Sequence, residues 1–113
     1  MGIHPHRPGF LEVSMHHFNP LWTIEVRGEV DATSAWLLTE PLMAATEGAA
    51  GHVVLDLSEV TFFGSHGLLV VLDAHHRATR RGVTLVVVCN RGVSRLFEVT
   101  GVAGTLCHDM VRV

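Results

Sequence analysis

The chain has 113 residues, of which 48% are hydrophobic and 17% charged, so it can fold around one core. Its net charge of −3 argues against general nucleic-acid binding, which usually depends on a basic patch. The longest apolar runs, 67–72 and 83–89, are far shorter than the about 20 residues that cross a bilayer, and residues 1–10 lack the apolar core of a signal peptide. We therefore expect a flexible lead-in over 1–10 and one domain over 11–113, without membrane insertion.

Alternating side chains predict two strands at the start of the domain. Residues 11–17 (LEVSMHH) and 22–27 (WTIEVR) place apolar side chains at every second position. Asn19 and Pro20 between them are typical of a turn. The two strands are therefore expected to form a hairpin.

A helix is expected after the second strand. The sequence GEVD at 28–31 should break the strand, and Asp31 is a good N-cap for a helix that runs to about residue 47. Pro41 falls inside this span and should kink the helix or split it.

Strands and helices then alternate. Residues 52–57 (HVVLDL) predict a strand, and Ser65 opens a helix that runs to about residue 80. The apolar run 83–89 suits a strand that is buried on both faces. A short helix over 93–100 and a last strand within 106–113 complete the chain.

The resulting order β-β-α-β-α-β-α-β predicts an α/β domain with a mixed, mostly parallel sheet and helices packed on it. Sites in such sheets form beyond the carboxyl ends of the strands. The loops 28–31 and 62–66 have that position here, and the second contains Ser65.

Three interpretations of Ser65 arise from its local sequence. A nucleophile elbow of a serine hydrolase needs Gly-x-Ser-x-Gly, but Phe63 stands two positions before Ser65, and the adjacent His66 points away from it. A hydroxyl at a helix N-terminus could instead carry a phosphate, because that end favours negative charge. It could also be a plain N-cap, contributing about 1 kcal/mol.

Histidine and cysteine do not form a recognisable metal pattern. The adjacent histidine pairs at 16–17 and 75–76 are poor chelates because neighbouring side chains diverge, and most of the histidines are expected to be solvated. Cys89 and Cys107 lie in apolar surroundings and are expected to be buried, reduced thiols of a cytosolic protein. No metal or cofactor is expected.

Three sequence blocks, in order and at matching spacing, resemble a STAS domain of the anti-sigma factor antagonist type. They are VRGEVD at 26–31, VVLDLSEV with FFGSHGL over 53–68, and VSRLFEVTGV at 93–102. The resemblance covers 11–113 and implies a cytoplasmic binding module rather than an enzyme. Its partner in that family is an anti-sigma factor that is also a serine kinase.

The resemblance implies that the kinase phosphorylates Ser65 and that its surroundings bind the partner. The phosphate adds about 1.5–2 negative charges, which the helix end tolerates and an interface does not. For Asp31 a contact to the partner and the N-cap role stay equally open. The implied partner-binding residues are Glu29, Asp31, Phe63, Gly64, Ser65, His66 and Gly67.

Two positions depart from the family pattern. Gly64 replaces the family's Asp before the serine, and His66 replaces the usual Ser or Thr after it. These departures keep open a STAS module that serves another partner, in a transporter or a stress-signalling assembly, without phosphorylation. A small hydrolase that uses Ser65 is a further alternative.

Overall fold

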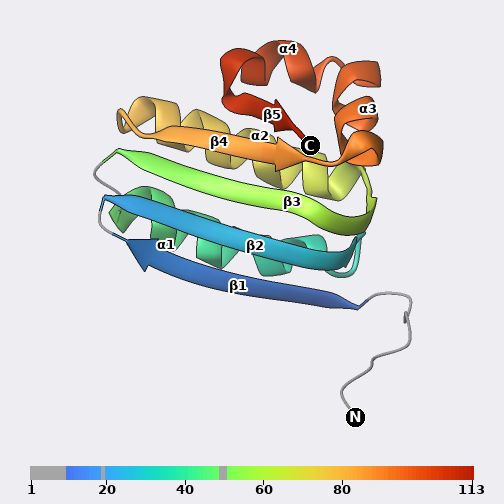
Figure 1. Cartoon of the computed structure of the whole chain (residues 1–113), viewed down its shortest axis with the longest axis horizontal. Helices are drawn as coiled ribbons and strands as arrows, with labels where there is room; N and C mark the ends of the chain where they lie inside the picture. Colours follow the sequence, from blue (N-terminus) through green and yellow to red (C-terminus); the bar gives the residue numbers. More distant parts are fainter. Residues whose placement is uncertain (1–9, 19, 49–50) are drawn as a thin grey trace.

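The computed structural model describes residues 10–18, 20–48 and 51–113, apart from the side chain of Cys107. Most of the predicted lead-in, residues 1–9, and the turn residue Asn19 lie outside this part of the chain. The described strands form one five-stranded sheet in chain order, with β1 antiparallel to β2 and all other neighbours parallel (Figure 1). The predicted mixed, mostly parallel sheet is therefore confirmed. The strands are β1 (Leu11–Phe18), β2 (Leu21–Val30), β3 (His52–Phe63), β4 (Thr84–Cys89) and β5 (Met110–Arg112).

The helices follow the predicted order, with one addition near the C-terminus. Residues 106–109, predicted to begin the last strand, instead complete a short helix that starts at Val102 and form a 3-10 turn, because Val102 and Leu106, one helical turn apart, both turn into the core. The prediction of a strand within 106–113 is thus right only for β5. The helical elements are η1 (Ala35–Leu38), α1 (Thr39–Gly48), α2 (Ser65–Arg80), α3 (Arg91–Val99), α4 (Val102–Leu106) and η2 (Cys107–Asp109).

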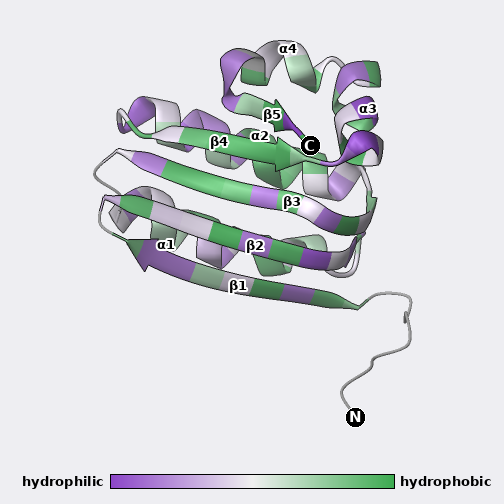
Figure 2. Cartoon of the chain, in the orientation of Figure 1, coloured by the Kyte–Doolittle hydropathy of each residue, from purple (hydrophilic) through white to green (hydrophobic). Residues whose placement is uncertain are grey.

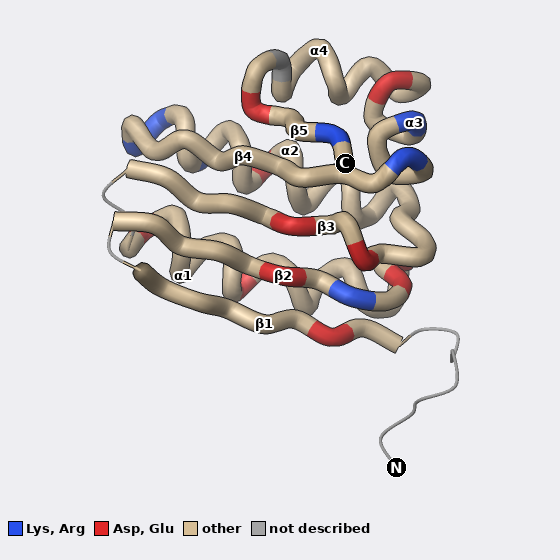
Figure 3. Tube along the Cα trace, in the orientation of Figure 1, with Lys and Arg blue, Asp and Glu red and all other residues tan. Residues whose placement is uncertain are grey.

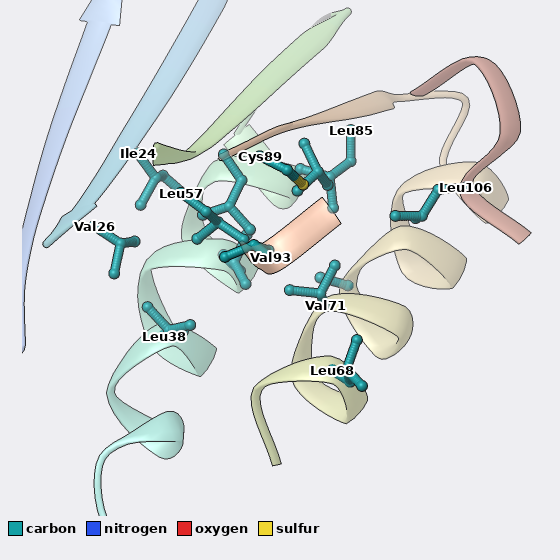
Figure 4. Close-up of a cluster of buried hydrophobic side chains, with 14 of the residues drawn as sticks. Ile24, Val26, Leu38, Leu57, Leu68, Val71, Leu85, Cys89, Val93 and Leu106 are labelled. Carbon is teal, nitrogen blue, oxygen red and sulfur yellow. The ribbon is translucent and has the colours of Figure 1, made fainter. Parts of the chain in front are cut away.

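The core lies between the sheet and helices α1 and α2, which cover the same face of it (Figure 1). Every second side chain points into this layer from Val53 to Leu57 of β3 and along β4, and both strands are largely apolar in Figure 2. Figure 4 shows how Leu38, Leu68 and Val71 from the helical layer meet these strand side chains. The fully buried strand side chains include Ile24, Val26, Val53, Leu55, Leu57, Leu85, Val87 and Cys89.

Strand β4 corrects one prediction. The apolar run at 83–89 suggested burial on both faces, but alternate residues of β4 are only half-buried. The reason is that α1 and α2 both pack on one side, so the other face of the sheet carries no helix over its centre (Figure 1). An unbroken run of valines therefore indicates a strand here, without indicating two covered faces.

Strands β2 and β3 run further than predicted. β2 continues through Gly28 to Val30, and β3 continues from Leu57 to Phe63. The β2–β3 register has two irregularities, the second next to Gly28, and Gly28 has a φ of +101°. These local distortions let the strand continue through the glycine where a break was expected. The predicted strand break at Gly28 is wrong for this reason.

The predicted first helix is divided into η1 and α1. Asp31 lies before η1, and α1 begins only at Thr39. Pro41 then falls in the first turn of α1, where its missing N–H removes no helical hydrogen bond. The expectation that Pro41 would split the span is confirmed.

Cys89 is a buried free thiol with no exposed surface, as predicted. Burial raises its pKa to about 11, and the charge of Arg112 offsets this only in part. The expectation for Cys107 lies outside the described side chains. Only a small fraction of the Cys89 thiol can thus be a thiolate near neutral pH.

We expect Cys89, studied in a Cys107→Ser variant, to resist a thiol reagent such as DTNB at pH 8 until the protein is unfolded. With a pKa of about 11 in place of 9.0, the thiolate fraction at pH 8 falls about a hundredfold. The raised pKa also has a consequence for stability: this thiol leaves the free energy of unfolding unchanged below pH 9 and lowers it as the pH rises from 9 towards 11. Rapid labelling of the folded variant at pH 8 would contradict both statements.

Candidate functional site

The two loops singled out by the sequence lie together at one edge of the sheet. Glu29 pairs with Phe62 and Val30 with Phe63 at the carboxyl ends of β2 and β3. The N–H of Gly64 donates to the carbonyl of Val30 at 2.9 Å, which joins the loop before α2 to the end of β2. The parallel register of β2 and β3 thus creates one continuous surface from two segments far apart in the chain.

Ser65 is the first residue of α2 and is exposed. The residue at the N-cap position is Gly64, in an extended conformation, so the interpretation of Ser65 as the N-cap is wrong. Among the described residues, the Ser65 hydroxyl has no hydrogen-bond partner. It therefore projects from the positive end of the longest helix without serving the helix itself.

Gly67 and Phe63 lie on the inner side of this first turn. A Cβ at Gly67 would lie 2.7 Å from the ring of Phe63 and 2.8 Å from Cγ1 of Val30, so the absent side chain lets α2 approach the sheet. Phe63 is 6% exposed and packs edge-on against Phe97, with ring centroids 5.7 Å apart. The room that Gly67 makes is filled by the core rather than open beside the hydroxyl.

The buried side chain of Phe63 offers little surface to a partner, and the place of Phe63 in the expected contact set stays a prediction. The aromatic ring on the surface is that of Phe62, which is 53% exposed and lies against the backbone of Gly64. His66 is exposed beside Ser65, and Leu69 one turn further along α2 is 65% exposed. The surface around Ser65 is thus partly apolar.

Asp31 has a structural role in the neighbouring loop. Its Oδ1 accepts hydrogen bonds from the hydroxyl and N–H of Thr33, at 2.8 and 2.9 Å, and from the N–H of Ser34 at 3.1 Å. These bonds, with those of Thr33 the strongest, hold the pKa of Asp31 below its usual value, so it is ionised at neutral pH. Asp31 caps the turn that leads into η1, not α1, and Glu29, two residues before it in the chain, is half-buried.

A catalytic triad at Ser65 is not supported by the geometry. The hydrogen-bonded His–Asp pair among the described side chains is His75 with Asp109, at 2.9 Å. His75 is ten residues further along α2, about 15 Å from Ser65 at 1.5 Å per residue. His75 is also buried, an exception to the expectation that most histidines are solvated. Within the described ranges, no three His, Cys, Asp or Glu side chains gather as a metal site would require.

Comparison with known proteins shows the family of the chain. The family model described as the STAS domain matches residues 12–109, so the chain belongs to the STAS domain family. None of the helices in the described part of the chain is long and apolar enough to span a membrane.

Several solved structures share the fold. An anti-sigma factor antagonist from Mycobacterium paratuberculosis is 22% identical with a TM-score of 0.83, over 95% of this chain and 90% of that one. The antagonist SpoIIAA in its unphosphorylated form is 17% identical with a TM-score of 0.72, over 90% and 88%. The phosphorylated form of the Bacillus cell fate determinant SpoIIAA is 16% identical with a TM-score of 0.68, over 90% and 91%. At these identities the likeness establishes the architecture of the domain.

Proposed function

We propose that this STAS domain is an anti-sigma factor antagonist that binds an anti-sigma factor with serine kinase activity and is switched off by phosphorylation of Ser65. The observation that carries the proposal is the exposed Ser65 hydroxyl, which stands at the N-terminus of α2 and takes no part in capping it. Structural neighbours support it, since they include two anti-sigma factor antagonists and SpoIIAA in its phosphorylated form. Such a module works in the cytoplasm and uses no metal or cofactor.

The local surface gives the switch a physical basis. A phosphate on Ser65 would gain from the unpaired N–H groups at the start of α2 in the free protein. In a complex it would have to be desolvated against a partner that also covers Phe62 and Leu69, which are 53% and 65% exposed. The modification therefore weakens binding without unfolding the domain.

Gly64 and His66 favour a second candidate, a STAS module that binds its partner without any phosphorylation. The residue immediately before Ser65 is Gly64, so this position offers no carboxylate to a kinase. Both candidates use the same surface, and they differ in whether Ser65 is a substrate.

The test is incubation with ATP and the anti-sigma kinase of the same genome, with Ser65→Ala as the variant and Ser14→Ala as the control. Ser14 is an exposed serine on β1, away from the site. We expect phosphate incorporation to be lost in Ser65→Ala and kept in Ser14→Ala, and Ser65→Glu to weaken kinase binding at least about tenfold. Ser65→Ala should change the free energy of unfolding by less than about 0.5 kcal/mol, since the Ser65 hydroxyl forms no hydrogen bond with any described residue.

Two outcomes would redirect the assignment. Undiminished phosphorylation of Ser65→Ala would remove Ser65 as the acceptor. Tight kinase binding without phosphate transfer, insensitive to Ser65→Glu, would favour the second candidate.

A further inference from the structure

An open groove runs between α1 and α2, on the side of these helices that faces away from the sheet. Its floor is apolar, built from Leu42, Val70 and Ala74, and it has a volume of about 190 Å³. Half-buried Met43 and exposed Leu69 stand on opposite sides of it. The groove is therefore a hollow with an apolar base and two helical walls.

Beside the end of the groove nearest Ser65, the chain exposes two large apolar side chains of η1. Trp36 is 66% exposed and Leu37 39%, and both border the hollow that shares Thr39 and Met43 with the groove. The indole N–H of Trp36 donates to the carbonyl of Thr33 at 2.9 Å. This bond orients the ring before any partner arrives, which lowers the entropy cost of using it as an anchor.

The other end of the groove is basic. Arg77, Arg80 and Arg81 gather there, three of the eight arginines in a chain of net charge −3 (Figure 3). Arg77 is paired with Asp73 at 2.9 Å. Glu47 also lines this end, but Arg80 and Arg81 form no ion pair with any described residue. Two guanidinium groups are thus available to carboxylates from outside.

We propose that the groove between α1 and α2 binds an amphipathic helix of a partner protein, with apolar side chains on Trp36, Met43 and Leu69 and carboxylates on Arg80 and Arg81. The span from Leu69 to Arg80 is eleven residues of α2, about 16 Å, which suits a partner helix of about three turns. Carboxylates favour a helix N-terminus, so the partner helix runs antiparallel to α2. Ser65 does not line the groove, so the proposal does not require Ser65 to be a kinase substrate.

The probe is a synthetic helical peptide of three to four turns, with leucines spaced i, i+3, i+4 and i+7 and three glutamates in its first turn. A matched peptide carries lysines in place of the glutamates. Binding to the full chain is followed by NMR shifts of the backbone amides. We expect the shifts to fall on η1, α1 and α2, and the lysine peptide to bind at least about tenfold more weakly.

Variants separate the two halves of the surface. Leu69→Glu should weaken the glutamate peptide about tenfold or more, since an apolar contact becomes a charge. The double change Arg80→Glu with Arg81→Glu should weaken the glutamate peptide about tenfold and strengthen the lysine peptide. Arg91→Glu with Arg95→Glu, exposed arginines on α3, is the matched control and should leave both affinities unchanged.

Several results would overturn the proposal. These are shifts that fall outside η1, α1 and α2, equal affinity for both peptides, and a loss of affinity in the α3 control as large as that at Arg80 and Arg81. A fourth is binding to vesicles of anionic phospholipid that Leu69→Glu abolishes, since it would make the surface a membrane contact. An unfolded variant would bind neither peptide. Tighter binding of the lysine peptide to the Arg80→Glu, Arg81→Glu variant would therefore show that this variant is folded.

Discussion

Gly28→Ala should lower the free energy of unfolding by about 3–5 kcal/mol. Gly28 has a φ of +101°, which an alanine adopts only with strain of about 1–3 kcal/mol. A Cβ at this position would also overlap the carbonyl oxygen of Phe10, which accepts the N–H of Glu29 at 2.7 Å. Relief of that overlap breaks the contact at the start of β1 and adds a cost of similar size. Urea unfolding followed by circular dichroism measures the sum.

Gly82→Ala is the matched control, because Gly82 has a φ of +72° and nothing lies within 4 Å of its would-be Cβ. It should cost about 1 kcal/mol, from backbone strain alone. The difference between the two variants isolates the Phe10 contact. Equal destabilisation of the two would mean that this contact is not kept in solution.

Asn90→Asp should lower the free energy of unfolding by about 2–4 kcal/mol, although the two side chains have the same shape. The Nδ2 of Asn90 donates to the carbonyls of Val60 and Ser58, at 2.7 and 3.2 Å, while its Oδ1 accepts the N–H of Val93 at 2.9 Å and caps α3. The change keeps the cap and turns the donor into a carboxylate oxygen that faces two carbonyl oxygens. β3, β4 and α3 thus lose the side chain that joins them.

Asn90→Ser is the matched variant, since serine caps a helix almost as well but brings no charge. It should cost less than Asn90→Asp at pH 7.5. Because the two carbonyls raise the pKa of the introduced carboxyl, the deficit of Asn90→Asp relative to the natural chain should shrink as the pH falls from 7.5 to 4.5. A deficit that is the same at both pH values, or no larger than that of Asn90→Ser, would show that the carboxylate does not face these carbonyls.

Local patterns in the sequence are sufficient for the order of the elements and the place of the site. The alternation at 22–27, the apolar residues at 52–57 and the apolar start of the helix at Ser65 each depend on a few neighbouring residues. Strands that alternate with helices leave little choice but a parallel sheet, whose carboxyl ends share one edge. For that reason the loops after β2 and β3 could be placed together before their contact at Val30 and Gly64 was seen.

The direction of individual side chains at the site could not be read in this way. Val53, Leu55 and Leu57 are buried in strict alternation, but the next buried residues of β3 are Val60 and Phe63. The register shifts between β2 and β3 change the parity. As a result the side chain of Phe63 lies in the core and that of Phe62 lies on the surface. The two phenylalanines are adjacent in the sequence, so local sequence alone does not show which of them is buried.

Burial and pairing across long separations depend on the assembled chain. The groove between α1 and α2, the hydrogen bonds of Asn90 to β3 and the pair of buried His75 with half-buried Asp109 all join residues more than twenty positions apart. Propensity and periodicity act within one element, so they specify strands, helices and their succession. The face of each helix or strand that packs against another element depends instead on close packing of the whole core. One bulge changes which side chains of a strand point into that core, and one missing Cβ changes how closely a helix can approach the sheet.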